Sequence, residues 1–276
     1  YIVPAMNTVM YNNPIIQENI SRLLKLGFNF VEPDSGLLAC GDVGKGKFPT
    51  IEKIEGTVFS ESELDLKGKK VLVTAGPTKE FIDPFRCLTN PSTGKMGIAI
   101  ANEFKKRGAE VILVTSVKND SINRDVKIIE IISTNDMFEA VKNNFKDCDY
   151  IVKAAAVSDY TPVQVYDKKV KKQDGNLTME FERTQDILKY VGENKTEEQI
   201  VVGFAAETND LLAYAREKIV KKNLDYIVAN DISKKDIGFG SEDNEVCIID
   251  KFNNITKIDK TSKANIAKEI VDIMSK

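Results

Sequence analysis

The sequence contains no histidine. This absence excludes Ser-His-Asp and Cys-His catalysis, histidine-ligated zinc and a histidine general base within this chain. Any acid–base or charge chemistry must therefore come from lysine, arginine, aspartate, glutamate, asparagine, tyrosine or cysteine side chains, or from a metal ion.

Cysteine is scarce, and its spacing does not fit a metal site. The four cysteines, Cys40, Cys87, Cys148 and Cys247, lie far apart and form no Cys-X-X-Cys pair. This spacing argues against zinc sites and disulfides, and it fits the reducing environment of the cytoplasm. We therefore expect a cytoplasmic protein.

Long apolar runs and a strong charge bias are missing too. No stretch approaches the roughly 20 apolar residues of a membrane-spanning helix, and no secretory signal peptide is apparent. The net charge is −3 and the pI is near 5.4, so nothing indicates binding to nucleic acid or to a membrane. The first residue is Tyr1 rather than methionine, and we expect a fragment or a cleaved product of a longer protein.

The 276 residues allow one large domain, or one domain preceded by a fragment. Residues 1–55 predict a short strand, a helix that begins at Asn13-Pro14 and a glycine-rich loop over 36–47, a piece too small to close a sheet. Residues 56–69 are polar and without a strong period, and they predict a linker. A separate unit is expected to begin at Lys70.

Residues 70–276 alternate between apolar strands and amphipathic helices. The pattern of strand, glycine-containing turn, helix and strand is the unit of a parallel sheet. Strands are expected over 70–74, 111–115, 127–132, 150–154, 199–204 and 226–229, helices over 94–107, 135–145, 184–192, 209–222 and 261–274, and a closing hairpin over 246–250 and 255–258. The sequence therefore predicts an α/β fold with a Rossmann-like, doubly wound, mostly parallel sheet.

Residues 162–182 interrupt this alternation and predict a hairpin flap outside the main sheet. The flap carries Lys168, Lys169, Lys171 and Lys172 before a turn at Asp174-Gly175-Asn176. In an extended segment Lys169 and Lys171 share one face, from which mobile ammonium groups can contact a triphosphate. A solvated charged strand is the commoner outcome for such a run.

Two segments after the first strand of this unit are candidate anion sites. Residues 75–78 can present backbone N–H groups to a phosphate, although they match neither Gly-X-Gly-X-X-Gly nor a Walker loop and are equally explained as a tight turn. Residues 90–97 lead into a helix whose N-terminus favours anions, and Arg86 lies just before them. Capping by Ser92 or Thr93 is the alternative; the glycines favour an anion site.

Small and polar residues also follow later strands. Residues 154–160 leave room for a ligand at a strand's carboxyl end, where Asp159 could bind Mg²⁺ or a ribose hydroxyl. The alternative is close helix–strand packing, with Asp159 as a cap. Phe204 ends another strand and could stack on a base. Lys218 and Lys222 share one face of the next helix, where they could belong to the ligand site or form an ordinary surface lysine pair. Together these segments favour a nucleotide-using enzyme over a scaffold.

Residues 70–276 resemble the bacterial phosphopantothenate–cysteine ligases, also called phosphopantothenoylcysteine synthetases. Six segments stand in the order expected of that family: 73–78, 90–97, 155–160, 169–172, 203–208 and 229–231. The resemblance covers essentially the whole ligase domain.

Residues 4–10 and 36–46 resemble two motifs of phosphopantothenoylcysteine decarboxylase, which precedes the ligase in many bacterial chains. The resemblance implies that Asn7 holds the substrate carboxylate and that Cys40 is the proton donor in reduction of the aminoenethiol intermediate. The FMN-binding portion of that family lies upstream of these motifs. We therefore expect FMN and decarboxylation only in an intact parent protein.

The ligase resemblance implies a two-step reaction with CTP and Mg²⁺. The carboxylate of 4′-phosphopantothenate attacks the α-phosphate of CTP, which gives an acyl-cytidylate and pyrophosphate, and the amine of L-cysteine then displaces CMP. A carboxylate is a poor acyl donor until its oxygen belongs to a phosphate leaving group. Joining two anions requires cations.

The same resemblance implies roles for individual residues. Asn90 and Lys169 would be catalytic, Arg86, Asn90 and Ala156 would bind substrate, and Asp159 would be the metal ligand. The nucleotide would contact Gly76, Ala155, Asp159, Lys169, Asp186, Ile187, Phe204, Lys218 and Lys222. The ligase domain would form a homodimer, with the flap reaching across it, and a higher oligomer could form through the decarboxylase domain.

Two other functions stay open on the residues alone. A dinucleotide-dependent oxidoreductase shares the strand–loop–helix start, but it predicts a Gly-X-Gly-X-X-Gly turn and an acidic residue after the second strand, where this chain has Ser116. A non-catalytic nucleotide- or flavin-binding module would bind nucleotide and release no pyrophosphate. The residues also leave the choice between CTP and ATP open.

Overall fold

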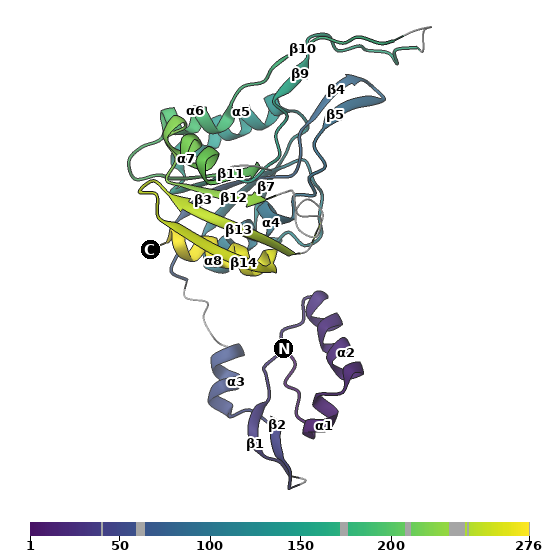
Figure 1. Cartoon of the computed structure of the whole chain (residues 1–276), viewed down its shortest axis with the longest axis vertical. Coiled ribbons are helices and arrows are strands. Elements are labelled where there is room, and N and C mark those ends of the chain that lie inside the picture. The colour runs from purple at the N-terminus through teal and green to yellow at the C-terminus, as the bar shows by residue number, and fades with distance from the viewer. Residues whose placement is uncertain are drawn as a thin grey trace. The chain divides into compact units, whose positions relative to one another are not determined.

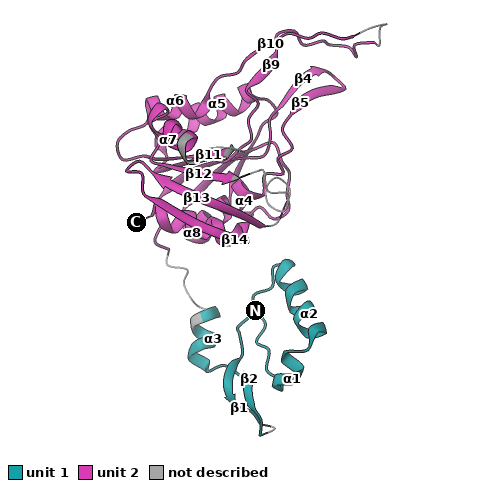
Figure 2. Cartoon of the chain, in the orientation of Figure 1, with its two compact units in different colours: residues 1–63 teal, residues 64–276 magenta. Residues whose placement is uncertain are grey.

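The computed structural model describes residues 1–39, 41–58, 64–171, 176–207, 211–231, 241 and 243–275. The chain divides into two compact units, residues 1–63 and 64–276 (Figure 2). The second unit begins before Lys70, the expected boundary, because Leu66 is only 2% exposed and packs in its core. None of the described helices has the length and apolar character to span a membrane.

The first unit is a small assembly of helices around one hairpin. Its elements are α1 (Thr8–Tyr11), α2 (Pro14–Lys25), β1 (Asp34–Leu37), β2 (Val43–Lys47) and α3 (Ile51–Val58). The side chain of Asn13 accepts a hydrogen bond of 2.9 Å from the Ile15 N–H, so α2 begins where the sequence predicts. Two expectations are wrong: the glycine-rich segment is a hairpin rather than a loop, and α3 extends into residues expected to be linker.

Glycine explains why the hairpin forms. A Cβ on Gly46 would lie 2.1 Å from the Met6 carbonyl oxygen, so only glycine lets β2 run against the N-terminal segment. The Met6 N–H donates to the Gly46 carbonyl oxygen at 2.9 Å. The sequence pattern shows the glycines but not the backbone segment that they approach.

The second unit contains one sheet of eight strands. Their order across the sheet is β7 (Lys127–Glu130), β6 (Glu110–Thr115), β3 (Lys70–Ala75), β8 (Tyr150–Lys153), β11 (Ile200–Glu207), β12 (Tyr226–Asp231), β13 (Asp243–Asp250) and β14 (Ile255–Ser262). Neighbours from β7 to β12 are parallel, and β13 and β14 are antiparallel. The predicted mostly parallel α/β fold is confirmed.

The strand order reverses between β3 and β8. From β3 the chain adds β6 and β7 on one side, then returns to β8 and adds the remaining strands on the other. In open parallel sheets the crevice at such a reversal, outside the carboxyl ends of the strands, is the usual place for a ligand.

Two layers of helices cover the sheet (Figure 1). The helices are α4 (Lys95–Lys106) and α8 (Lys263–Met274) on one face, and α5 (Thr134–Asn144), α6 (Ile187–Asn194) and α7 (Leu211–Lys221) on the other. Alternate residues of β3 serve the two faces: Val71 and Val73 pack with α4 and α8, and Leu72 packs with α5 and α6. All three are fully buried, as expected for a central parallel strand.

Two hairpins leave the sheet at the same end of the unit (Figure 1). One is β4 (Lys79–Asp83) with β5 (Arg86–Thr89), which the sequence pattern does not predict, and the other is β9 (Tyr160–Pro162) with β10 (Phe181–Arg183). The second confirms the predicted flap, although Lys172 and the turn at Asp174-Gly175 lie outside the described residues. We call the two hairpins with the segment from Val163 to Lys171 the arm.

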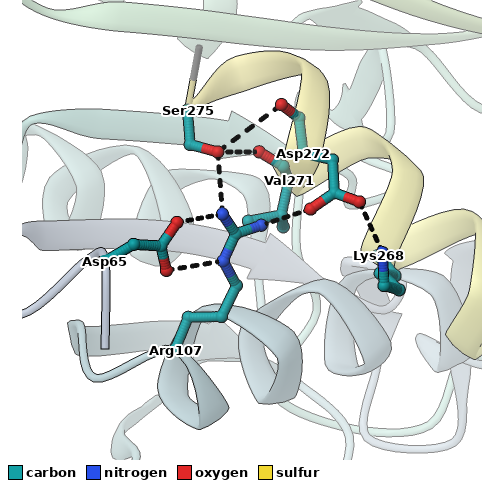
Figure 3. A network of polar contacts seen from close by, with 6 residues as sticks. All are labelled: Asp65, Arg107, Lys268, Val271, Asp272 and Ser275. Carbon is teal, nitrogen blue, oxygen red and sulfur yellow. Dashed lines mark hydrogen bonds and ion pairs between the residues drawn. The ribbon is translucent and has the colours of Figure 1, made fainter. Parts of the chain in front are cut away.

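The two ends of the second unit are joined through Arg107, the residue after α4. Its guanidinium bonds Asp65 through Nε at 2.9 Å and through Nη2, and it bonds Asp272 through Nη1 at 2.7 Å (Figure 3). The Arg107 side chain is 13% exposed, and it also donates to the Ser275 hydroxyl at 2.9 Å. Asp65 precedes the first strand and Asp272 lies in the last helix, so one side chain fixes both.

Candidate active site

Two adjoining cavities lie at the carboxyl ends of the strands, where the strand order reverses. The first cavity, of about 300 Å³, is lined by residues 92–97, 153–157, 159, 204, 205, 218, 230, 244 and 263. The second cavity, of about 340 Å³, is lined by residues 153, 157, 159, 160, 183–187 and 222. Lys153, Val157 and Asp159 belong to both, so the cavities meet at these three residues.

The structure brings most of the expected ligase residues together at these cavities. The first cavity is lined by Ala155, Ala156, Asp159, Phe204 and Lys218. The second is lined by Asp159, Asp186, Ile187 and Lys222. Four expected residues of the second unit lie elsewhere: Gly76 and Asn90 support the walls, and Arg86 and Lys169 lie in the arm.

Glycines allow the N-terminus of α4 to sit directly on the end of β3. A Cβ on Gly97 would lie 2.7 Å from the Ala75 Cβ, and a Cβ on Gly94 would lie 3.2 Å from the Gly76 nitrogen. Gly94 is the N-cap of α4, and no side chain caps the helix. Its first N–H groups therefore face the first cavity with the positive end of the helix dipole, which favours an anion there.

The segment from Ala155 to Ser158 is held in place by hydrogen bonds from β3 and the loops beyond it. The hydroxyl of Thr74 accepts from the Ala155 N–H at 3.2 Å, and that of Thr78 accepts from the Ser158 N–H at 3.0 Å. This anchoring fixes Asp159, the next residue, where the cavities meet.

Asn90 completes this anchoring. Its amide nitrogen donates to the carbonyl oxygens of Ala156 and Val157, each at 3.2 Å. Both amide hydrogens are therefore directed at protein backbone, and Asn90 is not among the residues that line either cavity.

A buried carboxylate supports the same wall from behind. Glu80 is 4% exposed, and its Oε1 accepts hydrogen bonds from the Thr134 N–H at 2.9 Å and hydroxyl at 2.7 Å. The Thr134 and Thr78 hydroxyls lie 3.0 Å apart. Sequence reasoning missed this network, because its members come from segments far apart in the chain.

The second cavity contains an ion pair between two expected residues. Asp186 caps α6 by accepting from the Lys189 N–H at 3.0 Å, and it pairs with the Lys222 ammonium at 2.9 Å. Burial alone would raise the pKa of the Asp186 carboxyl, but these hydrogen bonds and the nearby lysines outweigh it and lower the pKa. Asp186 is therefore a carboxylate at neutral pH, beside the buried Ile187.

Lys153 is a site residue that sequence reasoning missed. It ends β8 in the middle of the sheet, and its side chain is half-buried between the two cavities. Desolvation, helped by the positive charges of Lys222 and Lys218, lowers the pKa of its ammonium to about 8 in spite of Asp186 and Asp159. The available signal was a charged residue between an apolar strand and a run of alanines.

Arg86 and Lys169 lie together in the arm. Arg86 pairs with Asp83 at 2.8 Å and donates to the Val170 carbonyl oxygen at 2.6 Å, which binds the flap to the β4–β5 hairpin. The Lys169 ammonium lies 4.6 Å from the centre of the Phe85 ring, a cation–π contact. Within one chain the structure therefore does not bring these two residues to the cavities.

The arm exposes several large apolar side chains. They include Phe81, Phe85, Leu88, Val163 and Val165, which are at least 40% exposed. An apolar surface on projecting hairpins is typical of a protein contact.

The expected decarboxylase residues lie in the first unit. The amide nitrogen of Asn7 donates to Asp42 at 3.0 Å, and its oxygen accepts from the Val9 N–H at 2.8 Å as the N-cap of α1. The side chain of Asn7 is thereby oriented. Cys40 lies outside the described residues.

Few of the described acidic side chains lie close enough together to bind a metal ion. Among the described residues, no group of three or more histidine, cysteine, aspartate or glutamate side chains gathers to form a metal site. Asp159 and Asp186 both line the second cavity. One or two carboxylates together with substrate phosphates and waters are what Mg²⁺ ordinarily uses, so these residues fit that ion.

Comparison with known proteins gives a consistent result for both units. Residues 66–276 match the model of the DNA/pantothenate metabolism flavoprotein C-terminal domain, and residues 1–62 match the Flavoprotein model. The coenzyme A biosynthesis bifunctional protein CoaBC of Bacillus subtilis is 47% identical over 98% of this chain and 68% of its own length. The corresponding protein of Borreliella burgdorferi is 40% identical over 99% of this chain and 70% of its own length.

A solved structure matches the second unit. The C-terminal domain of a coenzyme A biosynthesis bifunctional protein CoaBC has a TM-score of 0.64 and 38% identity. The match covers 76% of this chain and 96% of that domain.

Proposed function

Because this chain belongs to the DNA/pantothenate metabolism flavoprotein family, we propose that its second unit is a phosphopantothenate–cysteine ligase of coenzyme A biosynthesis. In the proposed reaction, CTP activates 4′-phosphopantothenate as an acyl-cytidylate, and L-cysteine then displaces CMP. The observation that carries the proposal is the pair of joined cavities at the strand reversal, which combines a helix N-terminus, lysines and carboxylates around one space.

The first cavity suits the activation step. As the substrate carboxylate oxygen bonds to the α-phosphorus, the bond to the β-phosphate oxygen breaks and pyrophosphate carries away the negative charge. Lys95, Lys218 and Lys263 line this cavity together with the N-terminus of α4. Fixed positive charge at the place where negative charge develops lowers the barrier without reorganisation of solvent.

The second cavity suits the cytidine part of the nucleotide. The carboxylate of Asp186 can accept a hydrogen bond from a ribose hydroxyl, and Ile187 offers an apolar surface to the base. Asp159 lies where the cavities meet and would hold Mg²⁺. Bound there, Mg²⁺ would offset charge on the phosphates.

The second step places a demand on Asn90. In the proposed reaction the cysteine amine attacks the acyl carbonyl, the carbonyl–oxygen bond breaks and CMP leaves. Asn90 is proposed to bind that carbonyl, yet its amide hydrogens face Ala156 and Val157. The role therefore requires Asn90 to exchange one of these contacts when the intermediate forms.

The arm supports a homodimer. Lys169 and Arg86 lie outside the cavities of their own chain, on hairpins with exposed apolar side chains. We infer that a second copy covers this apolar surface, and that the arm of each copy supplies Lys169 to the cavities of its partner. Higher oligomers would involve the decarboxylase part.

The first unit is proposed to be part of an FMN-dependent decarboxylase in the intact parent protein. Asn7 would hold the carboxylate of phosphopantothenoylcysteine, and Cys40 would donate the proton in the reduction. The match of residues 1–62 to the Flavoprotein family supports this assignment. We propose a cytoplasmic location, since the few, widely spaced cysteines fit a reducing environment.

Pyrophosphate release tests the ligase directly. The assay contains Mg²⁺, 4′-phosphopantothenate and either CTP or ATP, with or without L-cysteine. We expect pyrophosphate with CTP and CMP formation only after cysteine is added; release with ATP would correct the nucleotide. Folded protein that binds nucleotide and releases no pyrophosphate would favour a binding module instead.

One variant tests the arm. Lys169→Gln is expected to slow pyrophosphate release at least ~10-fold, because it removes a cation that offsets phosphate charge. Its melting temperature should change little, since Lys169 is exposed and its ammonium contacts the exposed Phe85 ring. Lys168→Gln, a neighbouring exposed lysine, is the matched control and should keep wild-type rates. Equal activity in both variants would refute the role of Lys169.

A further inference from the structure

Lys153 occupies the central position of the site. It is the last residue of β8, and its backbone lies between Thr74 of β3 and Gly203 of β11, at the strand reversal. Its side chain lines both cavities. If one ligand fills both cavities, the group that connects its two parts lies beside the Lys153 ammonium.

Within the described residues, the Lys153 ammonium has no hydrogen-bond or ion-pair partner. No hydrogen bond or ion pair connects its side chain to another residue in the described ranges, whereas Lys222 pairs with Asp186 and Lys263 donates to the Ser241 carbonyl oxygen at 2.6 Å. A half-buried charge without a partner costs free energy, because hydration is lost and nothing replaces it. An anionic group on a ligand in the cavities would supply the missing partner.

The two cavities indicate which anion this is. The second cavity, with its carboxylates and Ile187, fits a ribose and base, and the first, with the α4 N-terminus and three further lysines, fits a chain of phosphates or an acyl group. The group that lies between a nucleoside and its remaining phosphates is the α-phosphate. In the acyl-nucleotide the same phosphate lies between the nucleoside and the acyl group.

We propose that Lys153 is a catalytic residue whose ammonium donates a hydrogen bond to a non-bridging oxygen of the nucleotide α-phosphate, in the substrate and in the acyl-nucleotide alike. This inference rests on the proposed function for the identity of the reaction. It adds a residue to that function: the central sheet itself supplies a cation, Lys153, to the reacting phosphate. The cations of the arm act in addition.

The contact couples nucleotide binding to a proton. The charged groups that face Lys153 are Asp159 from its own segment, Asp186 from the N-cap of α6, Lys218 from α7, and Lys222 from just after α7. In the free protein the Lys153 ammonium loses its proton near pH 8. A phosphate favours the charged form, so binding above pH 8 takes up a proton, and affinity falls as the pH rises from 7.5 to 9.5. The phosphate of CMP is already ionised there.

Calorimetric titration of CMP, CTP and cytidine tests the contact. Lys153→Met removes the charge and keeps the aliphatic length, so we expect CMP and CTP to bind at least ~10-fold more weakly at pH 7.5, by a similar factor for both, and cytidine to bind unchanged. Lys118→Met is the matched control, because Lys118 is 84% exposed. A loss confined to CTP would place the contact on the outer phosphates and overturn the assignment.

Proton uptake distinguishes a contact from a structural effect. Titrations in two buffers of different ionisation enthalpy at pH 8.5 should show proton uptake in the wild type and none in Lys153→Met. Lys153→Arg should restore binding without proton uptake, since a guanidinium stays charged. Wild-type affinity and uptake in Lys153→Met would overturn the inference.

The same measurements separate this inference from the ligase itself. If the wild type binds CMP with Lys153-dependent proton uptake but releases no pyrophosphate, the proposed reaction fails and the phosphate contact stands. If the wild type releases pyrophosphate and Lys153→Met binds CMP and reacts equally well, the contact fails and the ligase stands. Melting temperatures of both variants show that the protein is folded.

Discussion

Asp186 and Lys222 form an ion pair of 2.9 Å that joins the start of α6 to the residue after α7. The Lys222 side chain is 20% exposed and that of Asp186 is 44% exposed, so solvent screens the pair and its own contribution to stability is small. Asp186 has a second task as the N-cap of α6. The two tasks can be separated by mutation.

Asp186→Asn keeps an oxygen that can cap α6 and removes the charge, whereas Asp186→Ala removes both. We expect urea denaturation to show less than ~0.5 kcal/mol of destabilisation for the asparagine variant and about 1 kcal/mol for the alanine variant. Both should bind CTP roughly 10-fold more weakly, because a carboxylate accepts a stronger hydrogen bond from a ribose hydroxyl. Wild-type CTP affinity in both variants would remove Asp186 from the proposed nucleotide site.

Two glycines with the same backbone angle provide a matched test of the turn after β3. Gly76 has φ +81° and a Cβ there would lie 2.6 Å from Val117 Cγ2, whereas Gly68 has φ +82° and open space. Gly68→Ala should cost about 1 kcal/mol from backbone strain alone. Gly76→Ala should cost an additional 1 to 3 kcal/mol, approximately, from overpacking.

The same pair of variants has a functional readout. The crowding at Gly76 is next to Gly94 and the N-terminus of α4, so Gly76→Ala should also weaken CTP binding, and Gly68→Ala should not. Equal denaturation midpoints for the two variants would show that the turn relaxes to admit a methyl group.

Arg107→Met tests the connection between the two ends of the second unit. Removing the guanidinium takes away the ion-pair partner that Asp65 and Asp272 share. For this partly buried group we expect the free energy of unfolding to fall by about 2 kcal/mol at pH 7. Arg107→Lys should recover only part of that loss, because an ammonium lacks the fork geometry.

The effect should depend on pH in a definite direction. A hydrogen bond from Arg107 lowers the pKa of Asp65, and hydrogen bonds from Lys268 and then Arg107 lower that of Asp272. Stability from a lowered carboxyl pKa is complete above the ordinary value of about 4 and is lost as the pH falls through the lowered value. The gap between wild type and Arg107→Met in urea midpoints should therefore shrink below pH 4. A gap that is constant from pH 7 to pH 2.5 would contradict the ion-pair explanation.

Mixing two inactive variants tests whether the arm works in the partner. Lys169→Gln damages the arm and Lys222→Ala damages the cavities. If the arm reaches across, each hybrid dimer has one intact site, and random mixing should restore about a quarter of wild-type activity. Unmixed variants are the control, and the readout is pyrophosphate release after co-refolding. No recovery would mean that the arm serves its own chain.

The sheet could be predicted because its signals are local. Central strands such as β3 are continuous apolar runs, and the helices between them carry a 3.6-residue period. The β4–β5 hairpin escaped prediction because Asp83-Pro84 interrupts its pattern and half of its side chains face solvent. The hairpin of the first unit escaped because Gly44 and Gly46 conceal any alternation.

The site was only partly accessible to sequence reasoning. Alanines and Asp159 after β8 stand out, because strand ends at a reversal are predictable positions. Lys153 does not stand out, since a lysine at a strand end is ordinarily solvated. Only the folded structure brings Asp186 and Lys218, which act on its charge, close to it. The placement of Lys169 away from the cavities also depends on tertiary contacts, through Phe85 and Val170.

The contact between Arg107 and Asp65 also determines where this protein can be divided. A cut or gene fusion upstream of Asp65 leaves the second unit with both of its ends fastened, whatever sequence precedes it. A shortened protein that begins with the first strand at Lys70 would lose Asp65 and the buried Leu66, and its terminal helix would fray. The boundary for expressing an autonomous enzyme is therefore set by one side chain of the preceding segment, and not by where the sheet begins.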